Sequence, residues 1–183
     1  MKHLGAKTIE TERLILRKFK VIDADMMYKN WASDDNVTKY LTWPTHNSVE
    51  ISKYVLMDWE EKAKSNDNYQ WCIVLKQTGE AIGSIGVVQL METIDTAEIG
   101  YCIGSEFWNK GITTEALRSV INFLFNQVEV NRIEAGHDVN NPASGKVMQK
   151  CGLRFEGIQR KRGRNNVGIC DMAAYGMLKD DQQ

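Results

Sequence analysis

The sequence predicts one α+β domain, residues 1–183, built around a mixed, mostly antiparallel sheet. Three strand-like runs, "YQWCIVL", "EAIGSIGVVQL" and "TAEIGYCIG", are separated only by "KQTGE" and "METID", which are short enough for antiparallel connections. Further along, apolar residues recur at the spacing of a helix with one buried face. They are Ile112, Ala116, Leu117, Val120, Ile121, Leu124, Phe125 and Val128.

The remaining elements are predicted in chain order. "RLILRKF" (13–19) alternates polar and apolar side chains and is expected to form the first strand. Two helices follow within 22–64, one capped by Asp23 and one by Ser48, and they form a helical insert. After the long helix come a strand in "NRIEAGHDV", a short helix in "NPASGKVMQKCG" with Asn141 as cap and Gly152 as terminator, and a closing hairpin of "LRFEGIQRKR" and "ICDMAAYGML".

Charge and cysteine usage exclude several classes of function. The chain has 23 basic and 24 acidic residues, so no overall field attracts nucleic acid or membrane, and neither is expected as a partner. The four cysteines lack metal-ligand spacing, so we expect no metal and interpret them as small hydrophobic residues in a reducing compartment. Without a membrane-length apolar run or a hydrophobic signal segment, the expected location is the cytoplasm.

The stretch "FWNKGITTEAL" (107–117) joins the third of these strands to the long helix. Several amides at such a helix start lack acceptors within the helix, and the helix dipole adds partial positive charge there. Gly111 allows close approach of a phosphate, and Lys110 can supply a counter-charge. A plain turn followed by a helix cap explains the same residues, and neither a Walker loop nor a GxGxxG motif is present.

The order of these motifs resembles the GNAT acyltransferase superfamily, specifically its ribosomal-protein N-acetyltransferase (RimJ/RimL-like) type. The resemblance rests on "TAEIGYCIG", "SEFWNKG", "RIEAGHDV", "NPAS" and "KCGLRFEG", and it extends from "ETERLILRKF" to "DMAAYGML". It implies a six- to seven-stranded sheet flanked by helices, with a V-shaped splay between the two central strands. It also implies acetyl-CoA as cosubstrate, and it puts the insert at about 22–64 on the acceptor side.

The resemblance also implies which residues bind the cosubstrate. The family holds the pyrophosphate with backbone amides of the pattern [QR]xxGx[GA], to which Trp108, Gly111 and Thr113 correspond. Two of these three positions depart from the general pattern, yet "WNKG" followed by "TEAL" is similar to the version of the ribosomal type. The implied cofactor-binding residues are Cys102, Ile103, Trp108, Asn109, Lys110, Gly111, Ile112, Thr113, Thr114 and Asn141.

Two residues are predicted to be catalytic. Glu98 faces away from the apolar side of its strand and is the candidate base that takes the proton of the amine, although an ion pair on the sheet is the alternative. Ser144 corresponds to the serine that assists the leaving thiolate in the ribosomal type, whereas Met148 stands where many family members have a tyrosine. Asn141 is expected to bind a pantetheine amide, to cap its helix, or both.

Three hypotheses follow for the function. The leading one is an N-acetyltransferase whose amine acceptor is a protein N-terminus or a small molecule such as a polyamine or aminoglycoside. The second is a CoA-binding module without turnover, and the third is an RNA-binding protein that uses the basic residues of 160–164, although the neutral overall charge favours a solvated hairpin turn for them. The resemblance leaves the oligomeric state open between a monomer and a homodimer, the form that related enzymes often take.

Overall fold

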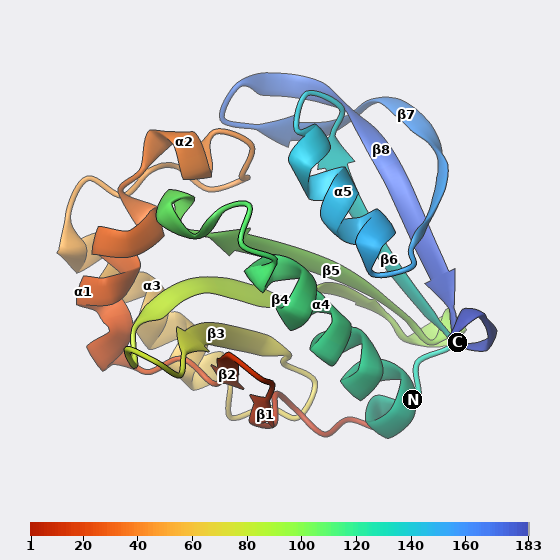
Figure 1. Ribbon diagram of the computed structural model, residues 1–183, viewed down its shortest axis with the longest axis horizontal. Coiled ribbons are helices and arrows are strands. Elements are labelled where there is room, and N and C mark those ends of the chain that lie inside the picture. Colours follow the sequence, from red (N-terminus) through yellow and green to blue (C-terminus); the bar gives the residue numbers. More distant parts are fainter. Residues whose placement is uncertain (183) are drawn as a thin grey trace.

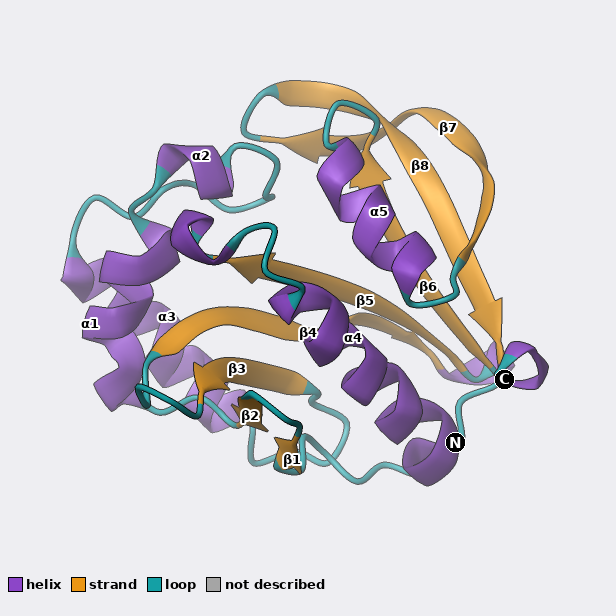
Figure 2. Ribbon diagram, viewed as in Figure 1, coloured by secondary structure: helices purple, strands orange, loops and turns teal. Residues whose placement is uncertain are grey.

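The protein forms one eight-stranded sheet in the order β1-β2-β3-β4-β5-β6-β8-β7 (Figures 1 and 2). The computed structural model describes residues 1–182. The strands are β1 (Ile9–Glu10), β2 (Leu14–Arg17), β3 (Gln70–Leu75), β4 (Ala81–Met91), β5 (Thr96–Ile103), β6 (Arg132–Asp138), β7 (Arg154–Asn165) and β8 (Gly168–Leu178). Sequence patterns predicted all but β1, whose two residues are too few to show a period. Every neighbouring pair is antiparallel except β5 and β6.

Helices cover both faces of this sheet. They are α1 (Ala24–Met27), α2 (Asp35–Thr38), α3 (Val49–Lys62), α4 (Ile112–Phe123) and α5 (Pro142–Lys150), together with π-helical turns at Tyr28–Ala32 and Leu124–Val128. In Figure 1, α4 and α5 lie in front of the sheet and α3 lies behind it. Alternation along β3 divides the core accordingly: Trp71 and Ile73 pack with α4, whereas Cys72 and Val74 pack with α1 and α3.

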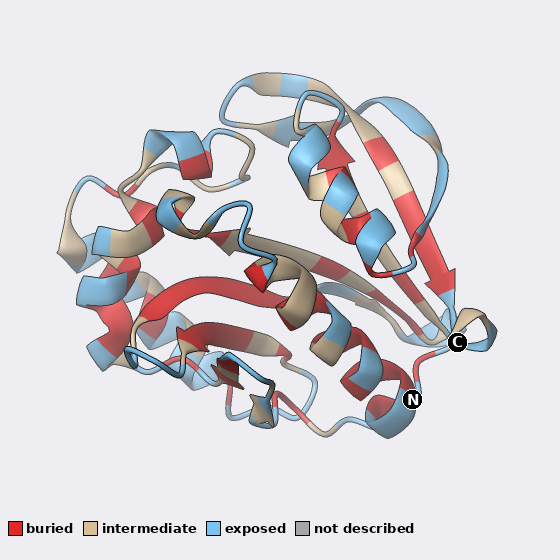
Figure 3. Ribbon diagram, in the orientation of Figure 1, coloured by how far each residue is buried: buried red, intermediate tan, exposed pale blue. Residues whose placement is uncertain are grey.

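The predicted apolar stripe of α4 is confirmed. Every residue of the stripe is buried, including Leu124, Phe125 and Val128 in the π-helical turn that continues the helix. Figure 3 shows the buried side of α4 turned toward the strands. The stripe anchors the helix on the sheet and so determines where the loop before it, 104–111, is held.

The V-shaped splay between the central strands is present. The parallel pairing of β5 with β6 covers only three rungs and ends where Glu98 lies opposite Glu134. Beyond this point β5 continues along β4 to Ile103, while β6 continues along β8 to Asp138. The two strands therefore diverge, as Figure 1 shows, and each leaves one edge unpaired. We call the point of divergence the fork.

Local details correct several predictions. Asp23 does not cap α1; its carboxylate instead accepts hydrogen bonds from the Arg17 guanidinium at 2.7 and 2.8 Å. Ser48 and Asn141 occupy the predicted N-cap positions, but their side chains make no capping bond. Gly152 follows α5 with a φ of 93°, as a terminating glycine does.

The insert and the closing hairpin also differ from expectation. The insert contains the additional single-turn helix α2 between the two predicted ones. The basic residues of 160–164 belong to strand β7 rather than to a turn, because the chain reverses only between Asn165 and Gly168. Among residues 1–182 no helix has the length and hydropathy needed to cross a membrane. No cluster of metal-ligating side chains occurs within that same range.

Candidate active site

The loop between β5 and α4 presents a row of free backbone amides. In residues 1–182, no backbone or side-chain acceptor binds the amides from Asn109 to Thr114, and the first regular bond of the helix runs from the Glu115 amide to the Gly111 carbonyl at 3.0 Å. Asn109 and Gly111 adopt left-handed φ angles of 60° and 75°, a conformation that recurs in anion-binding turns. Such a row, at the positive end of a helix dipole, is suited to hold an anion. We call it the cradle.

Two residues from the start of the chain hold the cradle in place. Arg13 donates to the Lys110 carbonyl at 2.9 Å and forms an ion pair with Glu115 in the first turn of α4 at 2.7 Å. Thr11 donates to the same carboxylate at 2.6 Å. The guanidinium also lies beside Gly111, so the cradle has a second basic side chain besides Lys110. The sequence offered no indication of this contact, because Arg13 lies in a strand-like run far from the loop.

Trp108 anchors the loop to the strand that precedes it. Its indole N–H donates to the Ile103 carbonyl at 3.0 Å, which folds the loop back onto the end of β5. Lys110 stands over the Phe107 ring, with 5.6 Å between the ammonium nitrogen and the ring centroid. The side chain of Trp108 therefore shapes the cradle, while the amides beyond it remain available.

The unpaired edge of β5 presents Ile103 rather than Cys102. The Gly104 amide donates to Ile82 on β4, and amides alternate in direction along a strand, so the Cys102 backbone also faces β4. Its thiol lies 3.3 Å from the Ser84 hydroxyl, on the side of the helical insert. The amide of Ile103 is directed into the splay. Sequence alternation separated the two faces of the strand but could not indicate which amides lie on the free edge.

Glu98 lies at the fork and is half-buried. No ion pair joins its carboxylate to another described residue, so the alternative of a salt bridge on the sheet does not occur within residues 1–182. Burial raises the pKa of the Glu98 carboxyl, the negative charge of Glu134 raises it further, and the positive charge of Arg162 opposes both. A carboxylate whose pKa is raised is a stronger proton acceptor than an ordinary glutamate.

Ser144 faces Tyr101 across the splay. The Tyr101 hydroxyl lies 3.0 Å from the Ser144 hydroxyl and also 3.0 Å from the carbonyl oxygen of that residue. Burial raises the pKa of the Tyr101 hydroxyl, so it stays protonated. Met148, one turn further along α5, is buried in the core. The sequence pattern assigned no role to the Tyr101 hydroxyl, although a lone tyrosine among aliphatic residues near the end of a strand was a usable indication.

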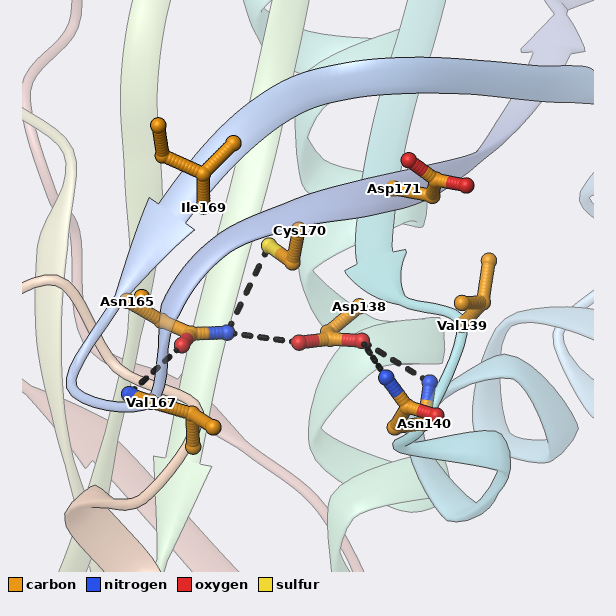
Figure 4. A pocket seen from close by; sticks show the side chains of 9 residues that line it. Asp138, Val139, Asn140, Asn165, Val167, Ile169, Cys170 and Asp171 are labelled. Atoms are coloured by element: carbon orange, nitrogen blue, oxygen red, sulfur yellow. Dashed lines mark hydrogen bonds between the residues drawn. The ribbon is translucent and has the colours of Figure 1, made fainter.

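The hairpin tip, residues 165–168, closes the far end of the splay. Asn166 donates through its side chain to the carbonyls of Thr38 and Trp43, both at 2.8 Å, and through its amide to Leu41 at 3.2 Å. Figure 4 shows Asn165 bound to the buried carboxylate of Asp138 at the end of β6, at 2.7 Å. The tip therefore connects β6 to the helical insert.

A further contact completes a ring around the splay. The Ser105 hydroxyl, just after β5, donates to Asp34 at the start of α2 at 2.6 Å. Hydrogen bonds thus connect the far end of β5 to the insert, the insert to the hairpin tip, and the tip to the far end of β6. A second substrate that approaches from the side of the insert meets this ring.

The aromatic residues of the insert separate into two groups. Trp31 is fully buried in the core. Trp59 is partly buried and packs on Phe19 with 5.0 Å between ring centroids. Trp43 and the exposed Tyr54 line a pocket between α1 and α3. The other residues that line it are Met27, His46, Val55, Asp58 and Trp59.

Comparison with known proteins agrees with this geometry. The chain belongs to the GNAT acetyltransferase family, because the family described as "Acetyltransferase (GNAT) domain" matches residues 13–154. It is 31% identical over 173 residues to "Uncharacterized N-acetyltransferase p20" of Bacillus licheniformis, covering 94% of this chain and 97% of that relative. The predicted resemblance to the superfamily is therefore confirmed, and the chain is an acetyl-CoA-dependent N-acetyltransferase.

Solved structures share the fold. A ribosomal-protein-S5-alanine acetyltransferase from Vibrio fischeri superimposes with a TM-score of 0.83 at 23% identity, covering 97% of this chain and 99% of that one. The microcin C7 self-immunity acetyltransferase MccE, in complex with acetyl-CoA and AMP, superimposes with a TM-score of 0.81 at 22% identity, covering 92% and 93% of the two chains. Proteins of the predicted ribosomal type are thus among the structural relatives.

Proposed function

We propose that the enzyme transfers an acetyl group from acetyl-CoA to a primary amine by direct attack, and that the α-amino group of a protein chain is the acceptor. The free amides of the cradle carry this proposal, because β5 leads directly from them to Glu98 at the fork. One strand thus connects an anion site with a candidate base. A likeness to ribosomal-protein acetyltransferases supports the choice of acceptor.

The chain's own residues fit the cosubstrate. The cradle amides, Lys110 and Arg13 would hold the pyrophosphate. The Ile103 amide, on the free edge of β5, would pair with the extended pantetheine or with the thioester carbonyl. The side chain of Asn141 makes no capping bond and is therefore free to bind a pantetheine amide.

The chemistry needs one proton acceptor and two hydrogen-bond donors. As the amine nitrogen forms its bond to the acetyl carbon, Glu98 takes the proton that nitrogen loses, directly or through water. The Ile103 amide stabilises the negative charge on the acetyl oxygen. As the carbon–sulfur bond breaks, the Ser144 hydroxyl donates to the thiolate, and Tyr101 holds that hydroxyl in place. Holding both reactants in one cleft supplies much of the rate.

Thiol release from acetyl-CoA in the presence of an amine panel tests the proposal. The panel contains short peptides with free N-termini, the same peptides with blocked N-termini, polyamines, aminoglycosides and amino acids. We expect turnover with the free peptides and none with the blocked ones. Preference for a polyamine or aminoglycoside would reassign the acceptor, and full kcat in both Glu98→Gln and Ser144→Ala would refute the assigned roles.

A CoA-binding module without turnover would be consistent with Met148, which is buried in the core and cannot donate a proton, but the family match and the relatives named N-acetyltransferases favour an enzyme. Calorimetric binding of acetyl-CoA without thiol release on any acceptor would identify such a module. The RNA-binding hypothesis predicts instead that binding depends steeply on salt and not on CoA. Sedimentation equilibrium would distinguish a monomer from a homodimer.

A further inference from the structure

Two carboxylates share the last rung before the splay, yet their surroundings differ. Glu98 on β5 and Glu134 on β6 are register partners in a parallel pair, so both side chains leave the same face of the sheet. Glu134 accepts a hydrogen bond from the Arg132 guanidinium at 2.7 Å. Among the residues that the structure describes, 1–182, no such partner reaches Glu98, whose register partner on β4 is the uncharged Gln89. One carboxylate at the fork is neutralised and the other is not.

Arg132 is anchored on the side away from Glu98. Its Nη2 atom donates to Glu156 on β7 at 2.5 Å, so the guanidinium extends from β6 across β8. It crosses β8 at Gly176, the residue opposite Glu134. A β-carbon at Gly176 would lie 2.5 Å from Arg132 Nη2 and 2.8 Å from Cζ, which no real contact allows. The absence of a side chain at this position is thus required by the path of the guanidinium.

The charged groups around Glu98 are few. Glu134 faces it from β6, and Arg162 acts on it from β7 without forming an ion pair within 4 Å. β4 contributes no charge at the register position. Arg132 on β6 is held by Glu134 at the fork, at 2.7 Å, and by Glu156 on the side away from Glu98, at 2.5 Å.

We propose that Arg132 and Glu134 are positioning residues for the transfer, in which Arg132, held across Gly176 by Glu156, neutralises Glu134 and leaves Glu98 as the carboxylate free to take the proton of the amine. This inference rests on the proposed role of Glu98 as base. If Arg132 were absent, two adjacent carboxylates would share a proton, and neither would be a reliable base at neutral pH. If Arg132 paired with Glu98 instead, the base would be too weak.

The pH dependence of kcat/KM tests the proposal, because its acidic limb should shift in opposite directions in two variants. Glu134→Gln removes the like charge and keeps Arg132, so the acidic limb of kcat/KM moves to lower pH by about one unit. Arg132→Gln leaves two uncompensated carboxylates, so the limb moves to higher pH by about the same amount. Gly176→Ala displaces the guanidinium and is expected to act in the direction of Arg132→Gln. General structural damage would lower activity without shifting the limb in opposite directions.

A matched control and a milder variant complete the design. Arg154→Gln removes another β7-region ion pair, the one to Asp181 at 2.7 Å, and we expect it to leave the limb unchanged. If Arg132→Gln does not fold, Glu156→Gln loosens the anchor from the exposed side and should give a smaller shift upward. Limbs that stay at the wild-type position, or that shift the same way in Glu134→Gln and Arg132→Gln, would overturn the proposal.

A readout without substrate separates this inference from the proposed function. The carboxyl carbon of Glu98, identified by its loss in Glu98→Gln, can be titrated by NMR in protein labelled with ¹³C-glutamate. We expect its midpoint to fall in Glu134→Gln and to rise in Arg132→Gln even if no acceptor is found. Absence of turnover together with these shifts would reject the acetyl-transfer role and keep the arrangement of charges, whereas unchanged midpoints would reject the arrangement itself.

Discussion

The hydroxyl groups of Tyr101 and Ser144 lie 3.0 Å apart, and they connect the free edge of β5 to the first turn of α5. Tyr101 also donates to the Ser144 carbonyl at 3.0 Å, so its own proton has two acceptors within reach on one residue. When that proton points to the carbonyl, the Ser144 proton is free to point elsewhere. The pair therefore has one donor to offer the leaving thiolate, and the geometry favours Ser144 as its source.

Substitution of the two residues separates their roles. We expect Ser144→Ala to lower kcat about 10- to 100-fold, because the thiolate loses its donor. We expect Tyr101→Phe to lower it less, by about 3- to 10-fold, because the serine hydroxyl remains but is less well held. Steady-state thiol release at saturating acetyl-CoA measures both. A larger loss in Tyr101→Phe would assign the donor to the tyrosine.

The base assignment predicts a specific pH dependence. The pKa of Glu98 is raised, so the carboxyl is protonated, and unable to act as a base, up to a higher pH than an ordinary glutamate. The ratio of kcat/KM between wild type and Glu98→Gln cancels the titration of the acceptor amine. This ratio should reach about 100 or more at pH 8 and approach 1 as the pH falls below the raised pKa. A ratio independent of pH would rule out Glu98 as the base.

The raised pKa of Glu98 also predicts how the free energy of unfolding depends on pH. Because the folded-state pKa of Glu98 lies above the unfolded value, ionisation at neutral pH favours the unfolded chain. The stability is complete below the unfolded pKa and is lost as the pH rises through the folded one. Glu98→Gln should therefore raise the free energy of unfolding at pH 7, and the gain should vanish below about pH 4.5. Urea denaturation at several pH values measures it.

The cradle predicts that Gly111 matters more than Trp108 for binding acetyl-CoA. Gly111→Val forces a β-branched residue to a φ of 75° and adds atoms where a phosphate would lie, so the Kd should rise at least tenfold. Gly79→Val is the matched control, because Gly79 has a φ of 71°, open space around it and a place in the turn between β3 and β4 rather than in the cradle. It should cost similar stability and leave the Kd unchanged. Trp108→Gln should weaken binding less, and equal losses from Gly111→Val and Trp108→Gln would count against the cradle.

Sequence patterns predicted the features that depend on neighbours along the chain. The stripe of α4 and the two faces of β5 follow from local periodicity, and the loop before α4 follows from a glycine at a helix start. The contact of Arg13 with Lys110 and that of Tyr101 with Ser144 join residues 97 and 43 positions apart. Such contacts depend on strand order and twist, which periodicity does not encode. For the same reason, the phase of the β5 ladder, which turns the Cys102 backbone toward β4 and leaves the Ile103 amide on the free edge, emerged only from the sheet.

The contacts of the hairpin tip predict that the acceptor side can be altered without changing the affinity for acetyl-CoA. Asn166→Ala removes two side-chain hydrogen bonds to the insert, at Thr38 and Trp43, and so opens the ring around the splay. Each bond contributes about 0.5–1.5 kcal/mol, so we expect the KM for the acceptor to rise roughly tenfold. The Kd of acetyl-CoA should stay within about twofold, because the hydrogen bonds of Asn166 go to the insert and not to the cradle.

A variant of a neighbouring residue at the same tip serves as the control for this prediction. Val167 is exposed, and its side chain makes no hydrogen bond, so Val167→Ala should change neither constant. Steady-state kinetics with a peptide acceptor gives the KM, and calorimetry gives the Kd. If Asn166→Ala weakened acetyl-CoA as much as the acceptor, the tip would be a general support of the fold rather than a boundary of the acceptor side. If a bulkier acceptor instead gained in kcat/KM, the ring would be acting as a size filter, because opening it would admit what the closed ring excludes.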